Sequence, residues 1–219
     1  MQTLTFSLAA FVLAALGFAH GALRLFHKKN PLYFQLLICA AGCFALQQLS
    51  TTVSTLCGGS AEHITVGLFG FFGCNFFLLS ANFGTLDRIV DDGSPANKAA
   101  KRLAFLAPVV MTACLVLVFL VWRGDLFDAV ALMIVLLPAL PASYFNLKHL
   151  LLPIDDFGFL RATRRCNLAA LVLYLVTAAY LLALGSGSTA AANVAVLVMS
   201  ASVLWLVFSA EGGAKAWKT

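Results

Sequence analysis

Charged residues are scarce in this chain. Lys, Arg, Asp and Glu make up 11% of its 219 residues, whereas apolar residues make up 62%. About a quarter of the residues of a soluble globular domain are charged, so this composition excludes that class and indicates a membrane protein. Basic residues outnumber acidic ones, but so little polar surface is available that we expect no nucleic-acid partner.

Ionisable side chains are also missing from the middle of each long apolar segment. The segment centres fall near Ala15, Cys43, Asn75, Thr112, Pro138, Leu175 and Ser200. Proton pumps and ion-coupled carriers place ionisable groups at that depth, so both classes are disfavoured. The sequence also lacks His-x-x-x-His and Glu-x-x-His pairs and a Gly-x-Ser-x-Gly motif. We therefore expect no catalytic residue, metal or cofactor, and nothing in the sequence favours an enzymatic role.

What the chain does contain is a series of seven apolar segments, each close to the length that a helix needs to cross a bilayer. They span residues 3–25, 32–55, 64–86, 103–122, 127–148, 166–185 and 190–210. We predict an all-α membrane protein with seven transmembrane helices, and we treat residues 1–219 as one domain.

Basic residues are distributed unevenly between the two sides of such a seven-helix topology. Thirteen of the fourteen Lys and Arg lie on one side, and only Arg123 lies on the other. Cytoplasmic loops are enriched in Lys and Arg. The asymmetry predicts an amino terminus outside and a carboxyl terminus in the cytoplasm. We expect a multi-pass protein of the cell (plasma) membrane, with membrane lipids as partners.

Residues 64–86 form the most informative segment, because 23 positions pass without a charge. On a helical wheel, one face carries the small residues Gly70, Gly73, Cys74, Ser80, Ala81 and Gly84. Asn75 and Asn82 lie on the opposite side, where lipid would leave their amides unpaired. Between them lies a stripe of phenylalanines, Phe69, Phe72, Phe76 and Phe83. Because two opposed faces need protein contact, we predict that this helix is the central and most enclosed one.

The second segment carries a polar cluster that begins with Gln47 and Gln48 and ends with Thr52. Such a cluster indicates either a wet cavity that opens outward or hydrogen bonds between helices, and both readings stay open. We expect a ligand to bind between this polar helix and the Phe-rich third helix. The predicted ligand-binding residues are Gln47, Gln48, Phe72, Asn75 and Phe76.

Asp87 and Arg88 follow the third segment directly and are the predicted switch residues. The wheel places Arg88 on the packed face, where a charge needs a partner or water. One reading is an interfacial anchor paired with Asp91 or Asp92. The other is a bridge to a neighbouring helix that ligand binding breaks.

Pro138 and Pro141 lie in the middle of the fifth segment. Each proline removes a backbone donor, so we predict that this helix bends near the middle of the membrane.

Seven helices, an outside amino terminus and short loops resemble the plan of rhodopsin-like receptors, and also that of the seven-helix sensory modules that precede bacterial histidine kinases. Asp87-Arg88-Ile89 is similar to the Asp/Glu-Arg-Tyr signature of those receptors. The receptors' Asn-Pro-x-x-Tyr and Trp-x-Pro motifs are missing, and residues 190–210 contain no lysine for retinal. The resemblance implies a sensor that signals through its cytoplasmic face to a cytoplasmic or membrane protein partner.

Two functions from different classes fit these observations. The favoured one is a receptor-like membrane sensor or partner subunit that binds an apolar or weakly polar ligand within the bundle. The alternative is a small neutral-solute transporter with a three-plus-one-plus-three helix plan, similar to the sugar-transporting SWEET family. In that plan, helices one to three and five to seven are parallel repeats.

Overall fold

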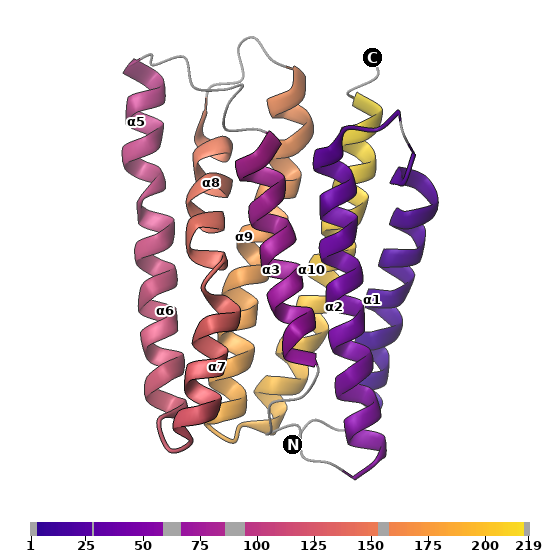
Figure 1. The fold of residues 1–219 in the computed structure, drawn as a ribbon, viewed down its shortest axis with the longest axis vertical. Helices are drawn as coiled ribbons and strands as arrows, with labels where there is room; N and C mark the ends of the chain where they lie inside the picture. The colour runs from indigo at the N-terminus through magenta and orange to yellow at the C-terminus, as the bar shows by residue number, and fades with distance from the viewer. Residues whose placement is uncertain (1–3, 28, 59–66, 86–94, 153–157, 217–219) are drawn as a thin grey trace.

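The computed structural model describes residues 4–27, 29–58, 67–85, 95–152 and 158–216. Within these ranges 91% of the residues are helical and none is in a strand. The helices lie side by side along the long axis of the molecule (Figure 1). The predicted all-α class is confirmed.

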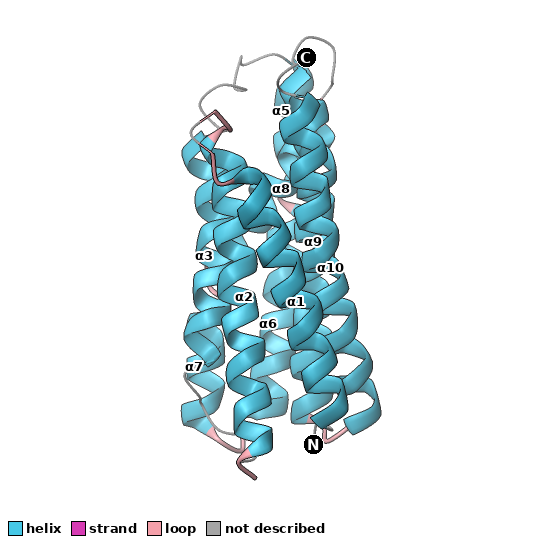
Figure 2. Cartoon of the chain, turned by 90° about the vertical axis from the view of Figure 1, so that its right-hand side faces the viewer, coloured by secondary structure: helices cyan, strands magenta, loops and turns pink. Residues whose placement is uncertain are grey.

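The described helices are α1 (Leu4–Leu25), α2 (Leu32–Leu56), α3 (Gly67–Thr85), α5 (Pro95–Ala104), α6 (Leu106–Trp122), α7 (Leu126–Leu136), α8 (Ala139–Leu151), α9 (Gly158–Gly185) and α10 (Thr189–Ala216). The helices α5 and α6 follow one another in a single rod, as do α7 and α8 (Figures 1 and 2).

Six of these rods are long and apolar enough to cross a membrane: α1, α2, α5–α6, α7–α8, α9 and α10. The apolar part of α3, Gly67–Phe83, is shorter. These lengths and compositions identify an integral membrane protein with transmembrane helices.

Neighbouring helices form a closed arrangement. In the order in which they contact one another, the helices are α1, α2, α3, α7–α8, α6, α9 and α10, and α10 returns to α1. Additional contacts join α2 to α10 and α8 to α9 across the bundle. The start of α1 and the end of α10 lie at opposite ends of the molecule (Figure 1).

Helix direction divides the bundle into two similar sets. The helices α1 to α3 run up, down and up in Figure 1, and α7–α8, α9 and α10 repeat that order. The rod α5–α6 runs downward between the two sets in the chain. As a result, α3 packs parallel to α8, and α1 packs parallel to α10.

The helix α3 has protein on two opposed faces, as predicted, but it is not the most enclosed helix. A Cβ at Gly70 would lie 2.6 Å from the backbone oxygen of Cys43 in α2, while Asn75 and Asn82 are buried on the side of α7 and α8. The buried share is largest in α2 and α10, and Phe69 is 77% exposed. Small residues on a helix indicate that a neighbouring helix packs closely against it, but they do not indicate how many helices surround it.

Several helices extend beyond the apolar segments that predict them. The helix α5 begins at Pro95, α9 begins at Gly158 and α10 continues to Ala216. Hydropathy marks the part of a helix that lies in hydrocarbon, whereas backbone hydrogen bonding continues into the headgroup region, where charged side chains are hydrated.

The fifth segment is interrupted at its first proline, and the bend predicted there stays a prediction. The helix α7 ends at Leu136 and α8 begins at Ala139, so the interruption lies at Leu137 and Pro138. The missing N–H of Pro138 removes one hydrogen bond of a continuous helix.

Candidate functional site

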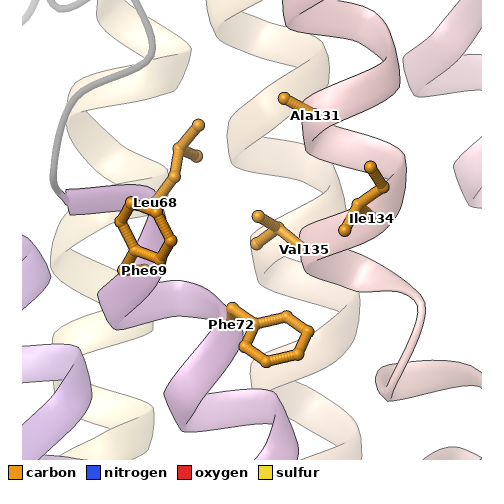
Figure 3. A pocket seen from close by; sticks show the side chains of 6 residues that line it. All are labelled: Leu68, Phe69, Phe72, Ala131, Ile134 and Val135. Carbon is orange, nitrogen blue, oxygen red and sulfur yellow. The ribbon is translucent and has the colours of Figure 1, made fainter.

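An apolar groove lies between α3 and α7, on the outer side of the bundle. Its volume is about 320 Å³. Figure 3 shows the side chains that line it, which are Leu68, Phe69, Phe72, Ala131, Ile134 and Val135. All six are hydrocarbon, so the groove can hold an acyl chain or another apolar group but offers it no side-chain hydrogen bond.

The groove follows from the spacing of side chains on the two helices. Leu68 and Phe72 are four residues apart on α3, and Ala131 and Val135 are four apart on α7, so each pair lies on one helix face. The small side chain of Ala131 leaves space opposite the larger residues of α3. Phe72 is 38% exposed and stacks on Phe76, with ring centroids 6.2 Å apart.

Asn75 connects the groove to the interruption between α7 and α8. Its Nδ2 donates a hydrogen bond of 3.2 Å to the backbone oxygen of Val135, which also lines the groove. Val135 lies in the last turn of α7, where Pro138 has prevented regular helix hydrogen bonding. In an apolar environment that carbonyl needs a donor from elsewhere, and Asn75 supplies it.

The structure brings Phe72, Phe76 and Asn75 together but not the two glutamines of α2. Gln47 contacts the opposite face of α3, where a Cβ at Gly70 would lie 2.7 Å from its Cβ. Its Nε2 donates to Thr51 Oγ1 of the same helix at 3.1 Å. Gln48 is completely buried, and its amide has no hydrogen-bond partner among the described residues. Neither glutamine lines the groove.

The polar cluster on α2 contacts α1 at Thr52. Its hydroxyl lies 3.1 Å from the backbone oxygen of Ser7 in α1 and 2.8 Å from that of Gln48 in its own helix. One hydroxyl proton serves these two acceptors, so both readings of the cluster stay open.

The predicted switch residues Asp87 and Arg88 lie outside the described residues, and so do Asp91 and Asp92. Their predicted pairing remains a prediction.

A buried polar network that the sequence analysis did not assemble joins α3, α8 and α9. Asn82 Nδ2 donates to Asn146 Oδ1, and Asn146 Nδ2 donates to the Tyr174 hydroxyl at 3.4 Å. His149 Nδ1 lies 3.1 Å from Asn82 Oδ1. An amide oxygen can only accept, so Nδ1 of His149 carries the proton in this contact. All four side chains are at least 98% buried.

A second buried contact lies on the same side of the bundle. The Tyr33 hydroxyl of α2 donates to Asn167 Oδ1 of α9 at 3.3 Å. Both side chains are almost completely buried. The interior between α2, α3, α8 and α9 is thus rich in amide, imidazole and phenol groups at the end where α3 and α8 finish.

An ion-pair cluster joins α1 to α10 at that same end. His20 Nε2 and Glu211 Oε2 are 2.8 Å apart, and Lys215 Nζ lies 2.8 Å from Glu211 Oε1. The carboxylate therefore lies between two cationic or hydrogen-donating groups.

The described residues contain no group of three His, Cys, Asp or Glu side chains that could hold a metal ion. The six cysteines are free thiols. The chemistry that this arrangement offers is the binding of apolar groups and hydrogen bonding.

Comparisons with protein families, curated proteins and solved structures find no match to this chain.

Proposed function

We propose that all seven rods cross the plasma membrane, with the amino terminus outside and the carboxyl terminus in the cytoplasm. Two observations support this topology. The start of α1 and the end of α10 lie at opposite ends of the bundle, as an odd number of crossings between them requires. The described basic residues at the end where α10 finishes include Arg24, Lys98, Lys101, Arg102, Lys148, Arg164, Arg165 and Lys215, whereas Arg123 lies at the other end.

We infer that the protein is a membrane sensor or partner subunit that binds an apolar or weakly polar ligand in the α3–α7 groove. The observation that carries this proposal is the position of the groove directly beside the interruption in α7–α8. Val135 belongs to both features, because its side chain lines the groove and its carbonyl accepts the Asn75 hydrogen bond.

The interruption allows a ligand in the groove to change the packing at the far end of α8. A ligand that separates α7 from α3 would change the angle at Leu137 and Pro138, where regular hydrogen bonding is already broken. Beyond that point α8 carries Asn146 and His149, which pair with Asn82 of α3. A ligand that favours one angle would therefore shift the population of two packings of the polar network. A cytoplasmic or membrane protein partner would detect that change.

Photolabelling with a diazirine fatty acid in nanodiscs tests the groove. We expect cross-links to Phe69, Phe72 and Ile134, and competition by laurate. Ala131→Phe fills the groove and should abolish this labelling. Ala113→Phe makes the same substitution at an exposed position of α6 and should leave it unchanged. Equal labelling of both variants would show that the fatty acid reports bulk lipid only.

Distances between spin labels at the ends of α3 and α8 test the sensor function. Laurate should shift their distribution in the wild type but not in Ala131→Phe. Labelling without any shift would leave a lipid-binding groove and contradict a sensor.

The parallel arrangement of the two helix sets favours the transporter alternative. Parallel repeats require α1 to α3 to match α7–α8, α9 and α10 in direction, and the helices run in that order. The pairs α3 with α8 and α1 with α10, which such repeats would relate, are both parallel and in contact. Uptake of labelled neutral sugars into proteoliposomes tests this function. Saturable uptake that empty liposomes lack would favour the transporter over the sensor.

A further inference from the structure

Side-chain contacts join the two helix sets at three places near the end of the bundle where α10 finishes. In the closed arrangement of helices the sets meet twice, where α10 contacts α1 and where α3 contacts α7–α8. A histidine takes part in the contact at each of these joints. A tyrosine makes the third contact in the interior between them.

The two histidine contacts lie at equivalent places in the two sets. His20 belongs to α1, the first helix of its set, and its Nε2 lies 2.8 Å from Glu211 of α10. His149 belongs to α7–α8, the first element of the other set, and its Nδ1 lies 3.1 Å from Asn82 of α3. All four residues lie within the last two turns of their helices. Each joint is thus closed by a histidine from a first helix and a polar side chain from a third helix.

The third contact joins the middle helices of the two sets. The Tyr33 hydroxyl of α2 donates to Asn167 Oδ1 of α9 at 3.3 Å, and both side chains are buried. Cys166, which precedes Asn167 in α9, is only 1% exposed. Separation of the two sets at this end of the bundle would break all three contacts and would bring water to this part of the interior.

Within each set the helices are held more closely. A Cβ at Gly70 of α3 would lie 2.6 Å from the backbone oxygen of Cys43 in α2, and a Cβ at Gly213 of α10 would lie 2.5 Å from that of Ala162 in α9. At the joint between α1 and α10, a Cβ at Gly17 would first meet a side chain, at 3.2 Å. Side chains can change rotamer, whereas a helix backbone moves only with its helix. Each set is therefore the more rigid unit, and the bundle opens most easily between the sets.

We propose that these three contacts form a latch that closes the polar interior, and that the two helix sets separate as units when the latch opens. Side-chain hydrogen bonds are suited to a reversible latch, because water replaces most of their energy when they break. Opening lets water hydrate amide and phenol groups that the closed interior pairs with one another. The latch depends on the two helix sets and not on a ligand in the α3–α7 groove, so a negative result in the groove experiment leaves it in place.

The thiol of Cys166 reports the state of the latch, because it is buried while the latch is closed. Its reaction with a small water-soluble methanethiosulfonate can be timed in nanodiscs, in the full chain with alanine at the other five cysteine positions. Glu211→Leu breaks the contact at the α1–α10 joint, and Asn82→Leu breaks the contact at the α3–α8 joint. Each should accelerate the reaction by on the order of tenfold, the effect of one lost contact on an opening equilibrium. The two effects should multiply in the double variant.

Tyr33→Phe removes a single hydroxyl and keeps the test open if a larger substitution prevents folding; it should accelerate the reaction as well. Thr52→Val is the matched control, because the Thr52 hydroxyl contacts Ser7 within the first set. This variant should leave Cys166 protected. Acceleration in Tyr33→Phe but in neither Glu211→Leu nor Asn82→Leu would show that the contacts act locally and would overturn the latch. Unchanged rates in all variants, or an equal acceleration in Thr52→Val, would also overturn it.

Discussion

At the scale of single residues, Asn75 shows how one amide can stabilise a helix other than its own. It belongs to α3, yet its Nδ2 donates to a carbonyl in the last turn of α7. That carbonyl lies just before Pro138, among apolar side chains, where no water is at hand to replace a missing donor. Asn75 is only 5% exposed. Its position in the middle of an apolar helix is therefore explained by the neighbour's interrupted backbone.

Replacing Asn75 by leucine should destabilise the protein. The substitution keeps the approximate volume but leaves the Val135 carbonyl without this donor, so we expect a loss of about 0.5–2 kcal/mol in the free energy of unfolding. Unfolding in bicelles on addition of dodecyl sulfate measures it. Thr112→Val is the control, because this exposed hydroxyl bonds only to Pro108 of its own helix. A loss no larger than the control's would mean that the bond contributes nothing.

The residue scale is also where sequence reasoning succeeds in part. The burial of Asn75 and Asn82 is predicted correctly, because an amide facing lipid is costly at any position of the bundle. Gln47 and Gln48 point about 100° apart as consecutive helical residues, and neither lines the α3–α7 groove, so a ligand site that includes them stays a prediction. The network of Asn82, Asn146 and His149 needs the knowledge that α3 and α8 are neighbours. Nothing in the sequence of either helix contains that information.

At the scale of helices, α10 closely approaches α9 and α2 at Gly213. A Cβ there would lie 2.5 Å from the backbone oxygen of Ala162 in α9 and 2.8 Å from the ring of Phe34 in α2. A Cβ at Gly212 would have no neighbour within 4 Å. Two consecutive glycines in one helix therefore have opposite environments.

Gly213→Ala should separate α10 from α9, because a backbone oxygen cannot move aside as a side chain can. We expect a loss of about 1–3 kcal/mol in the free energy of unfolding. Gly212→Ala should be neutral or stabilising by up to about 1 kcal/mol, since alanine favours the helix. Thermal unfolding of the two variants in the same detergent compares them. Equal destabilisation would contradict the close contact at Gly213.

The interruption between α7 and α8 and the Asn75 hydrogen bond should be energetically coupled. Pro138→Ala restores an N–H that can donate to the Ile134 carbonyl and lets the helix continue. The N–H of Ala139 could then reach the Val135 carbonyl, which would depend less on Asn75. Asn75→Leu should then cost less in the Pro138→Ala background than in the wild type, by about 0.5–1 kcal/mol. A double-mutant cycle of unfolding free energies measures the difference. Strictly additive losses would show that the two features are independent.

At the scale of the whole molecule, the spans are more predictable than their arrangement. Apolar length predicts the six helices that are long enough to span, and Pro138 predicts where α7–α8 is interrupted, because both follow from local chemistry. The centre of the bundle is different. The small residues of α3 and of α10 look alike in sequence, yet α10 contacts α1, α2 and α9, whereas α3 packs on α2 and one broken helix.

The proposed orientation predicts the outcome of reporter fusions. Alkaline phosphatase, which is active only outside the cytoplasm, should be active when fused after Gly58 and inactive when fused after Thr219. Exposed Cys57 should also react with a membrane-impermeant maleimide on intact cells. Activity of both fusions, or of neither, would contradict an odd number of crossings.

The repeated up-down-up order has a consequence for how the chain is inserted. Each three-helix unit begins on one side of the membrane and ends on the other. Two units with the same direction therefore cannot be joined by a short loop, because the first ends on the side opposite to the one where the second begins. In the seven-span topology, the rod α5–α6 is therefore the element that carries the growing chain back across the bilayer. Its deletion would deliver α7 to the translocon from the wrong side. Lys148 and Arg164 would then lie outside the cytoplasm, against the positive-inside rule. The second unit would insert either in the inverted orientation or with one of its spans left out of the membrane.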